Sequence, residues 1–359
     1  MSQRPGVVVL AAYRPDPVLF TRQLVSVAEQ TRTDFRCLVG ADGGQAEVRR
    51  LVAEAVGDDP RFEVLGWDDN LGFYLNFERL LAAVPEDAGW VALCDQDDRW
   101  YPDKLDRLLP LLDDADLVTG QARVVSWPSG EVLLERTGRC VVEADDLLFQ
   151  NQVTGAFTVV RRQLLDIALP FPRLHTVTQL HDHWLALCAV TTGRYTVLDE
   201  AVQDYVQHGG NQVGEIATHR GWTPARFLRR VIELGDTYEG GHSLVQCARA
   251  CQVQSFEWRR LVLDTLRGRV GVLPESLERE WGRLAPAASA WAVGAQLWRA
   301  TRSPDTSPWV VATFLPGIPY ELFRRRRARP AAGRQTAGPT SSKVEPVTRT
   351  RQVGRSTSR

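Results

Sequence analysis

The sequence lacks any apolar run long enough to cross a lipid bilayer, because no stretch approaches the roughly 18 to 20 residues that a membrane-spanning helix needs. The apolar run at residues 7–12 is too short for a signal peptide and fits a first β-strand better. The six cysteines are scattered without a CxxC pair, so they indicate buried thiols in a reducing compartment and no zinc site. We therefore expect a cytoplasmic protein that is not integral to a membrane.

Three common motifs of nucleotide-binding and hydrolytic enzymes are also missing. The first predicted strand runs into AAYRP at residues 11–15, without the GxGxxG fingerprint of dinucleotide-binding folds. The chain has no GxxxxGK[ST] sequence, which argues against P-loop nucleotide hydrolysis, and no GxSxG elbow, which argues against an α/β-hydrolase. No internal repeat is present.

Charge is divided unevenly along the chain. Hydrophobic residues make up 44% and charged residues 24% of the 359, as in an ordinary soluble protein. The formal net charge of −1 combines about +10 over residues 324–359 with about −11 over residues 1–323. We expect an α/β domain at residues 1–215, a helical region at 216–327 and a disordered basic tail at 328–359. Such a tail would face a polyanion or an anionic membrane.

Strand and helix patterns alternate through the first half of the chain, which predicts a mostly parallel sheet flanked by helices. Strands are expected at 7–12, 35–40, 62–65, 91–94, 116–126, 131–135, 153–160 and 194–198. Helices are expected at 17–30, 45–56, 72–84, 161–168 and 181–191, and in the C-terminal region at 224–235, 242–267, 275–283 and 288–300.

The stretch VALCDQDDRWYPDKL, residues 91–105, is the most informative part of the sequence. Its apolar strand delivers Asp95, Asp97 and Asp98 at the carboxyl end, where open α/β sheets bind ligands. Crowded carboxylates repel one another unless a cation lies among them, and Mg²⁺ or Mn²⁺ prefers oxygen ligands together with substrate phosphates. A solvated acidic loop that caps the next helix is the alternative.

Other polar groups follow strand ends and helix starts. Asp42 precedes two glycines, and Asn70 begins a predicted helix, although an ordinary turn and an N-cap explain these two residues as well. Gly155 ends the polar run QNQVTG. In His181-Asp182-His183-Trp184, Asp182 is a candidate general base. A zinc site at the two histidines is disfavoured because residues i and i+2 diverge on a helix.

In their order along residues 5–214, these motifs resemble glycosyltransferase family 2, and in particular rhamnosyltransferase-like enzymes of bacterial surface polysaccharide assembly. The specific parts of the resemblance are DQDDRWYPDKL and the pair of segments HDHW and YVQHGGN. The second segment of the pair contains His208. The resemblance implies a GT-A fold, a nucleotide-diphosphate sugar donor, inversion at the anomeric carbon and a divalent cation, Mg²⁺ or Mn²⁺.

The resemblance also implies a role for each matching residue. Asp182 would be the catalytic base. The nucleotide-sugar site would comprise Tyr13, Arg14, Asp42, Asn70, Asp95 and Gly155, and the metal site Asp95, Asp97, Asp98 and His208. Two departures concern the donor: residues 41–44 read ADGG where the family has two acids before Gly-Ser, and Val206 stands where the subgroup usually has arginine.

The expected activity is transfer of a deoxyhexose, such as rhamnose from dTDP-rhamnose, to a hydroxyl of a glycan or lipid-linked acceptor. Alternatives are a transferase that uses a UDP- or GDP-hexose and an inactive sugar-binding scaffold subunit. The aromatic segment at 309–323 runs into Arg324–Arg327, which suggests peripheral binding at the inner face of the plasma membrane. A packed helical subdomain with a solvated tail is the alternative. No nucleic-acid partner is expected, since the tail lacks interleaved aromatics, and a homodimer is left open.

Overall fold

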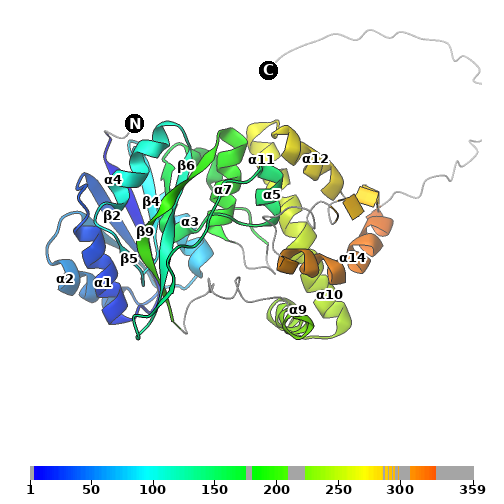
Figure 1. Ribbon diagram of the computed structural model, residues 1–359, viewed down its shortest axis with the longest axis horizontal. Coiled ribbons are helices and arrows are strands. Elements are labelled where there is room, and N and C mark those ends of the chain that lie inside the picture. The colour runs from blue at the N-terminus through cyan, green and yellow to red at the C-terminus, as the bar shows by residue number, and fades with distance from the viewer. Residues whose placement is uncertain are drawn as a thin grey trace, which may run out of the picture.

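The computed structural model describes residues 4–174, 180–208, 223–285 and 308–328, together with 288–289, 291–292, 294–295 and 298 (Figure 1). An α/β part built on one sheet occupies one side of the molecule, and a group of C-terminal helices packs against its flank. Residues 329–359, which hold almost all of the predicted basic tail, lie outside the described residues.

The first half of the sheet is parallel and grows by helical crossovers. Its elements are β1 (Gly6–Ala12), α1 (Pro17–Ala28), β2 (Phe35–Asp42), α2 (Gln45–Val56), β3 (Phe62–Trp67), α3 (Phe73–Ala82) and β4 (Trp90–Cys94). β1 pairs in parallel with both β2 and β4, and β2 pairs in parallel with β3. The short apolar runs that predicted β1 and β4 are buried on both faces, as expected of central strands.

The second half of the sheet is mixed. It contains β5 (Arg99–Trp100), α4 (Lys104–Leu108) with a 3₁₀ turn (Leu109–Asp113), β6 (Leu117–Ser126), β7 (Val132–Leu134), α5 (Ala144–Phe149), a 3₁₀ turn (Gly155–Phe157), β8 (Thr158–Arg161), α6 (Leu164–Ala168), α7 (His181–Thr192) and β9 (Tyr195–Gln207). The strand order is β3-β2-β1-β4-β8-β6-β9-β5, with β7 beside β6. β8 runs antiparallel to β4 and β6, whereas β9 is parallel to β6.

The α/β class with flanking helices is therefore confirmed, and the sheet is mixed where the sequence suggested a mostly parallel one. Among the described residues, four strand pairs are parallel and four are antiparallel. Two elements differ most from expectation. β9 continues to Gln207 instead of ending near residue 198, and the expected strand at 153–160 begins only at Thr158, after the 3₁₀ turn.

Two apolar cores cover the two faces of the sheet. One contains side chains from α1, α2 and α4, such as Phe20 and Leu105. The other contains side chains from α3 and α7, such as Phe77 and Trp184, and continues without interruption into C-terminal side chains that include Phe256. The helical region thus shares its core with one face of the sheet.

The C-terminal region is helical, as predicted. Its helices are α9 (Pro224–Glu239), α10 (Leu244–Gln252), α11 (Trp258–Val270), α12 (Glu275–Leu284) and α14 (Pro308–Ala328), with a π-helical segment, Val253–Glu257, between α10 and α11. The helix expected at 288–300 falls only partly within the described residues. The domain boundary near residue 215 stays a prediction. Of the helices in the described part of the chain, none combines the length and the apolar character needed to cross a bilayer.

Candidate functional site

The candidate site begins where the strand order reverses. From β1 the chain builds outward through β2 and β3, and then returns to place β4 on the other side of β1. The carboxyl ends of β1 and β4 therefore flank a topological switch point, the position at which open α/β sheets bind ligands. Tyr13 follows β1, and the loop after β4 carries the three aspartates.

Gln96 joins these two strand ends. Its side-chain oxygen accepts a hydrogen bond from the backbone N–H of Tyr13 at 2.7 Å, and its side-chain nitrogen donates to the Tyr13 carbonyl at 3.2 Å. The Tyr13 ring is 42% exposed, and the exposed Arg14 lies with its guanidinium carbon 5.3 Å from that ring. Arg14 has a φ of 42°, which is rare outside glycine and is common at ligand-binding sites. Tyr13 and Arg14, both predicted for the donor site, thus lie exposed at the carboxyl end of β1.

Asp42 is buried at the end of β2 and is fully engaged by the protein. Its carboxylate accepts hydrogen bonds from the backbone N–H groups of Leu71 and Gly72, at 2.8 and 2.9 Å, and from Arg79 at 2.7 Å. Asn70 is exposed, and its side-chain oxygen accepts a hydrogen bond from Gly72 N at 2.9 Å. Asp42 therefore fixes the loop that carries Asn70.

The three aspartates after β4 occupy different environments. Asp98 is 1% exposed; one oxygen accepts a hydrogen bond from Val206 N at 2.9 Å and the other from the Gln203 side chain at 2.7 Å. Burial, with the charges of Asp97 and Asp95, raises the pKa of Asp98 well above its usual value. Asp98 thus ties the acidic loop to β9.

Asp97 and His208 form the more accessible part of the predicted metal site. An Asp97 carboxylate oxygen lies 2.7 Å from His208 Nε2, and the two side chains are 16% and 21% exposed. Asp95, between β4 and this pair, is partly buried, and burial together with the charge of Asp97 raises the pKa of the Asp95 carboxyl to about 7. Gly209 to Asn211 lie outside the described residues.

This donor set suits a cation that is shared with a ligand. No group of three or more His, Cys, Asp or Glu side chains within the described part of the chain has the geometry of a closed metal site. Mg²⁺ bound to nucleotides typically takes one or two protein carboxylates, with phosphate oxygens and water in its other positions. Asp97 and Asp95 offer two carboxylates, and His208 lies beside Asp97 as a third potential ligand.

Lys104, from the same motif, is wholly buried behind the acidic loop. Its ammonium donates to the Ala156 carbonyl and to the Gln203 side-chain oxygen, both at 2.6 Å, and lies 3.7 Å from the centre of the Trp100 ring. Burial lowers the pKa of Lys104 to about 7, against the opposing effect of nearby acidic groups. Because Gln203 in turn donates to Asp98, Lys104 fixes the orientation of the amide that supports the loop.

Asp182 lies in the first turn of α7, partly buried, and its carboxylate is held by three N–H donors. One oxygen accepts from the Asn151 side chain at 2.9 Å and from His183 N at 2.6 Å, and the other accepts from Gly155 N at 3.1 Å. A carboxylate has about four lone-pair positions, so these donors leave one for a substrate hydroxyl. The residue after Gly155, Ala156, accepts from Lys104, whose partner Gln203 donates to Asp98, so hydrogen bonds connect Asp182 to the acidic loop.

Gly155 thus contacts Asp182 through its backbone. It also lies against His181, because a Cβ atom on residue 155 would be 2.5 Å from His181 Nε2. The His181 ring stacks on Phe77 at 3.9 Å, whereas His183 Nε2 lies 2.6 Å from the Leu147 carbonyl. The two histidines therefore face different surroundings and do not form a zinc pair, as their spacing predicted.

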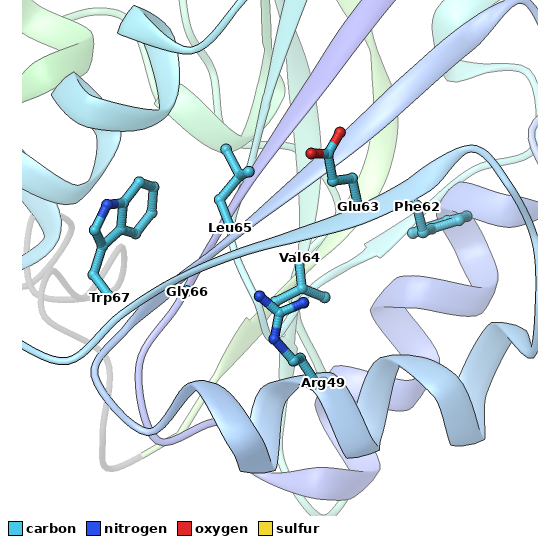
Figure 2. Close-up of a pocket in the computed structure, with 7 residues that line it drawn as sticks. All are labelled: Arg49, Phe62, Glu63, Val64, Leu65, Gly66 and Trp67. Carbon is cyan, nitrogen blue, oxygen red and sulfur yellow. The ribbon is translucent and has the colours of Figure 1, made fainter.

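One groove of the described structure lies away from these residues. It measures about 600 Å³ and is lined by Arg49 of α2 and by residues 62–67 of the edge strand β3. Figure 2 shows Val64 on the side of Arg49, with Glu63 and Leu65 on the other side of the strand and Trp67 at one end. None of the predicted site residues lines this groove, so the groove is separate from the candidate site at the strand ends.

Sequence reasoning missed several residues of this arrangement. Asn151 belongs to the polar run QNQVTG, which gave only a weak signal, and its contact with Asp182 spans 31 positions. Gln96, inside the acidic motif, gave no separate signal. Gln203 and Arg79 sit within strand and helix patterns and became visible only through their partners in space.

Comparison with known proteins gives a family match for the N-terminal part. Residues 8–164 match the family described as Glycosyl transferase family 2. This range includes the acidic loop and ends before Asp182 and His208. No curated protein matches the sequence.

Two solved structures share the general arrangement. S. aureus TarS 1-349 in complex with UDP-GlcNAc has a TM-score of 0.49 and 14% identity, with 90% of each chain covered. The mannosyltransferase PcManGT from Pyrobaculum calidifontis in complex with GDP-Man and Mn²⁺ has a TM-score of 0.43 and 15% identity, with 88% of this chain and 87% of that chain covered. At these scores neither similarity carries an argument about activity. The family match over residues 8–164 and the α/β sheet agree on a GT-A-type fold, and the chain is a glycosyltransferase.

Proposed function

We propose that this glycosyltransferase moves a sugar, with inversion, from a nucleotide-diphosphate donor to an acceptor hydroxyl. The observation that carries the proposal is the set of hydrogen bonds that connects Asp182 to the acidic loop. Gly155 N donates to Asp182, and the next residue, Ala156, accepts from Lys104, whose partner Gln203 donates to Asp98. A donor group and a base can therefore meet at one edge of the sheet.

In the proposed reaction, an acceptor oxygen attacks the anomeric carbon as the bond from that carbon to the diphosphate breaks. Asp182 takes the hydroxyl proton, and the nucleoside diphosphate leaves with the bonding electrons. Asp97, His208 and Asp95 would hold the divalent cation, which when bound would supply Lewis-acid stabilisation of the leaving group. Tyr13 and Arg14 border the nucleobase, and Asp42 acts by fixing the loop at Asn70.

The preferred donor in this proposal is dTDP-rhamnose, with a glycan or lipid-linked acceptor in surface polysaccharide assembly. The HDHW and YVQH segments support this choice through their resemblance to rhamnosyltransferase-like enzymes. A UDP- or GDP-hexose is the second candidate donor, because ADGG and Val206 depart from the subgroup. Peripheral membrane contact would suit a lipid-linked acceptor. Within the predicted cluster Arg324–Arg327, Arg325 is buried and donates to Glu321, so this arginine does not face a membrane.

The test measures thermal stabilisation by dTDP-rhamnose, dTDP, UDP and GDP, each with and without Mn²⁺ or Mg²⁺, and the release of nucleoside diphosphate from the preferred donor. The wild type should bind one nucleotide in a metal-dependent way. Asp182→Asn should keep that binding and lose release by about 100-fold or more. Absence of nucleotide binding under every condition would favour the scaffold alternative, and full release by Asp182→Asn would remove the assigned base.

A further inference from the structure

One buried side chain of the helical C-terminal region, Arg259 of α11, contacts the end of α5. The loop that follows α5 carries Asn151, which holds the Asp182 carboxylate. The Arg259 guanidinium donates to the Leu148 carbonyl at 3.1 Å and to the Phe149 carbonyl at 2.8 Å. These are the last residues of α5, where carbonyl groups have no partner within the helix. Arg259 is 6% exposed, so its bonds to α5 are shielded from water.

Arg259 is itself anchored on its own side. Its remaining terminal nitrogen donates to the carbonyls of Gln254 and Ser255, at 3.0 and 2.9 Å, in the π-helical segment before α11. The guanidinium also lies 5.4 Å from the centre of the Phe149 ring and 4.9 Å from that of Phe314 in α14. Four hydrogen bonds from one planar guanidinium thus connect the end of α5 to the π-helical segment with a fixed geometry.

Two residues after this contact, the chain reaches Asn151, which binds Asp182. Phe149 ends α5, and Asn151 follows with its side-chain amide 2.9 Å from the Asp182 carboxylate. The Asn151 side-chain oxygen accepts from Val153 N at 3.0 Å, which fixes the turn toward Gly155. His183 adds a second link, since its Nε2 lies 2.6 Å from the Leu147 carbonyl in α5.

We propose that Asn151 and Arg259 are positioning residues for the transfer reaction: Arg259 of the helical region fixes the end of α5, and Asn151 orients the Asp182 carboxylate. This inference rests on the proposed role of Asp182 as the base. It gives the C-terminal region a part in the chemistry, although none of its described side chains contacts the acidic loop in a recorded hydrogen bond.

The next residue, Arg260, provides a matched control. It is also a largely buried arginine of α11, but its bonds go to the Leu284 carbonyl at 2.7 Å and to Glu321 at 2.8 Å, within the helical region. Replacing either arginine with methionine removes a buried cation from the same helix. Only Arg259→Met also releases α5.

The experiment compares Asn151→Ala, Arg259→Met and Arg260→Met in the full-length chain, well below each melting temperature. Asn151→Ala and Arg259→Met should lower kcat about 10- to 100-fold with the donor KM within twofold of the wild type, because misplaced groups reduce the rate more than they reduce binding. Arg260→Met should keep kcat within twofold. The double variant Asn151→Ala with Arg259→Met should lose less than the product of the two single losses.

Other results overturn the proposal. If Arg259→Met and Arg260→Met have the same kcat, the contact with α5 is merely structural. If Asn151→Ala keeps the wild-type kcat while Asp182→Asn is inactive, Asp182 is the base but Asn151 does not orient it. Full activity of Asp182→Asn would instead defeat the proposed function itself. Should Arg259→Met be insoluble, Arg259→Lys keeps the charge without the fork and should still lower kcat.

Discussion

The Asp42 carboxylate lies 2.7 Å from the Arg79 guanidinium, and this buried pair joins the end of β2 to α3. The same guanidinium lies over the ring of Trp67 at the end of β3, 3.9 Å from its centre. Burial lowers the pKa of Arg79, and the charge of Asp42 opposes that change. Three neighbouring elements of the sheet edge therefore depend on one ion pair.

Replacing Asp42 with asparagine should lower the free energy of unfolding by about 3 kcal/mol, because Arg79 would be left without its buried counter-charge. The donor KM should rise as well, since the loop at residues 70–72 loses its anchor. Chemical denaturation and donor titration measure the two effects. Asp69→Asn is the control: Asp69 is 67% exposed and 3.6 Å from the same guanidinium, so its loss should cost less than about 1 kcal/mol. Equal effects of both variants would contradict this account.

Folding stability should depend on pH through His183. Burial lowers the pKa of His183 to about 4, below its ordinary value of 6.5. Between pH 6.5 and 4 the unfolded chain therefore binds a proton at this residue that the folded chain does not. The contribution of His183 to stability thus falls as the pH falls, by on the order of 3 kcal/mol over that window, while the raised pKa of Asp95 acts in the opposite direction. Urea unfolding at several pH values measures this slope. His183→Gln, which can still donate to the Leu147 carbonyl, should show a smaller slope; an unchanged slope would assign the effect elsewhere.

Two aspartates of the acidic loop should have different roles, with Asp97 as a metal ligand and Asp98 as a structural support of the loop. Asp97→Asn should abolish the metal-dependent thermal stabilisation by a nucleoside diphosphate, with little change in the melting temperature of the protein alone. Asp98→Asn should instead destabilise the protein by about 2 kcal/mol, because an amide cannot accept from both the Val206 N–H and the Gln203 side chain. Differential scanning fluorimetry with and without Mn²⁺ separates the two results. Reversed behaviour would make Asp98 the metal ligand.

Gly155 should tolerate no side chain while His181 is present. A Cβ atom at residue 155 would lie 2.5 Å from His181 Nε2, so Gly155→Ala must displace that ring or the backbone N–H that contacts Asp182. We expect a loss of about 1 to 3 kcal/mol and a lower kcat. In a double-mutant cycle, His181→Ala should recover part of the stability that Gly155→Ala removes. Strict additivity of the two substitutions would exclude the clash.

The first half of the fold was predictable because its signals are local. The strand–helix alternation follows from short β-branched runs and helical spacing, and α2 begins and ends where the pattern predicted. β9 was underestimated because its second half carries polar residues such as Gln203 and Asp204. These are buried through partners on β6, α4 and the acidic loop, which the local sequence does not reveal.

The site could be predicted residue by residue only in part. Asp95, Asp97 and Asp182 were recognisable as candidates because carboxylates stood at a strand end and a helix start. Asn151 was not, because its importance comes from a side chain 31 positions away, and Arg259 has carbonyl partners 110 and 111 positions away. Contacts with backbone carbonyls leave no pattern of complementary side chains in a sequence.

The partners of Arg259 have a consequence for the response of the protein to salt. Dissolved ions weaken exposed pairs such as Arg50 with Glu47, but they screen buried contacts far less. Arg259 is buried and its recorded hydrogen bonds end on carbonyl groups, so raising the ionic strength should leave the connection between the helical region and α5 in place. Because these acceptors belong to the main chain, the side chains at residues 148 and 149 can also diverge among relatives without removing the connection.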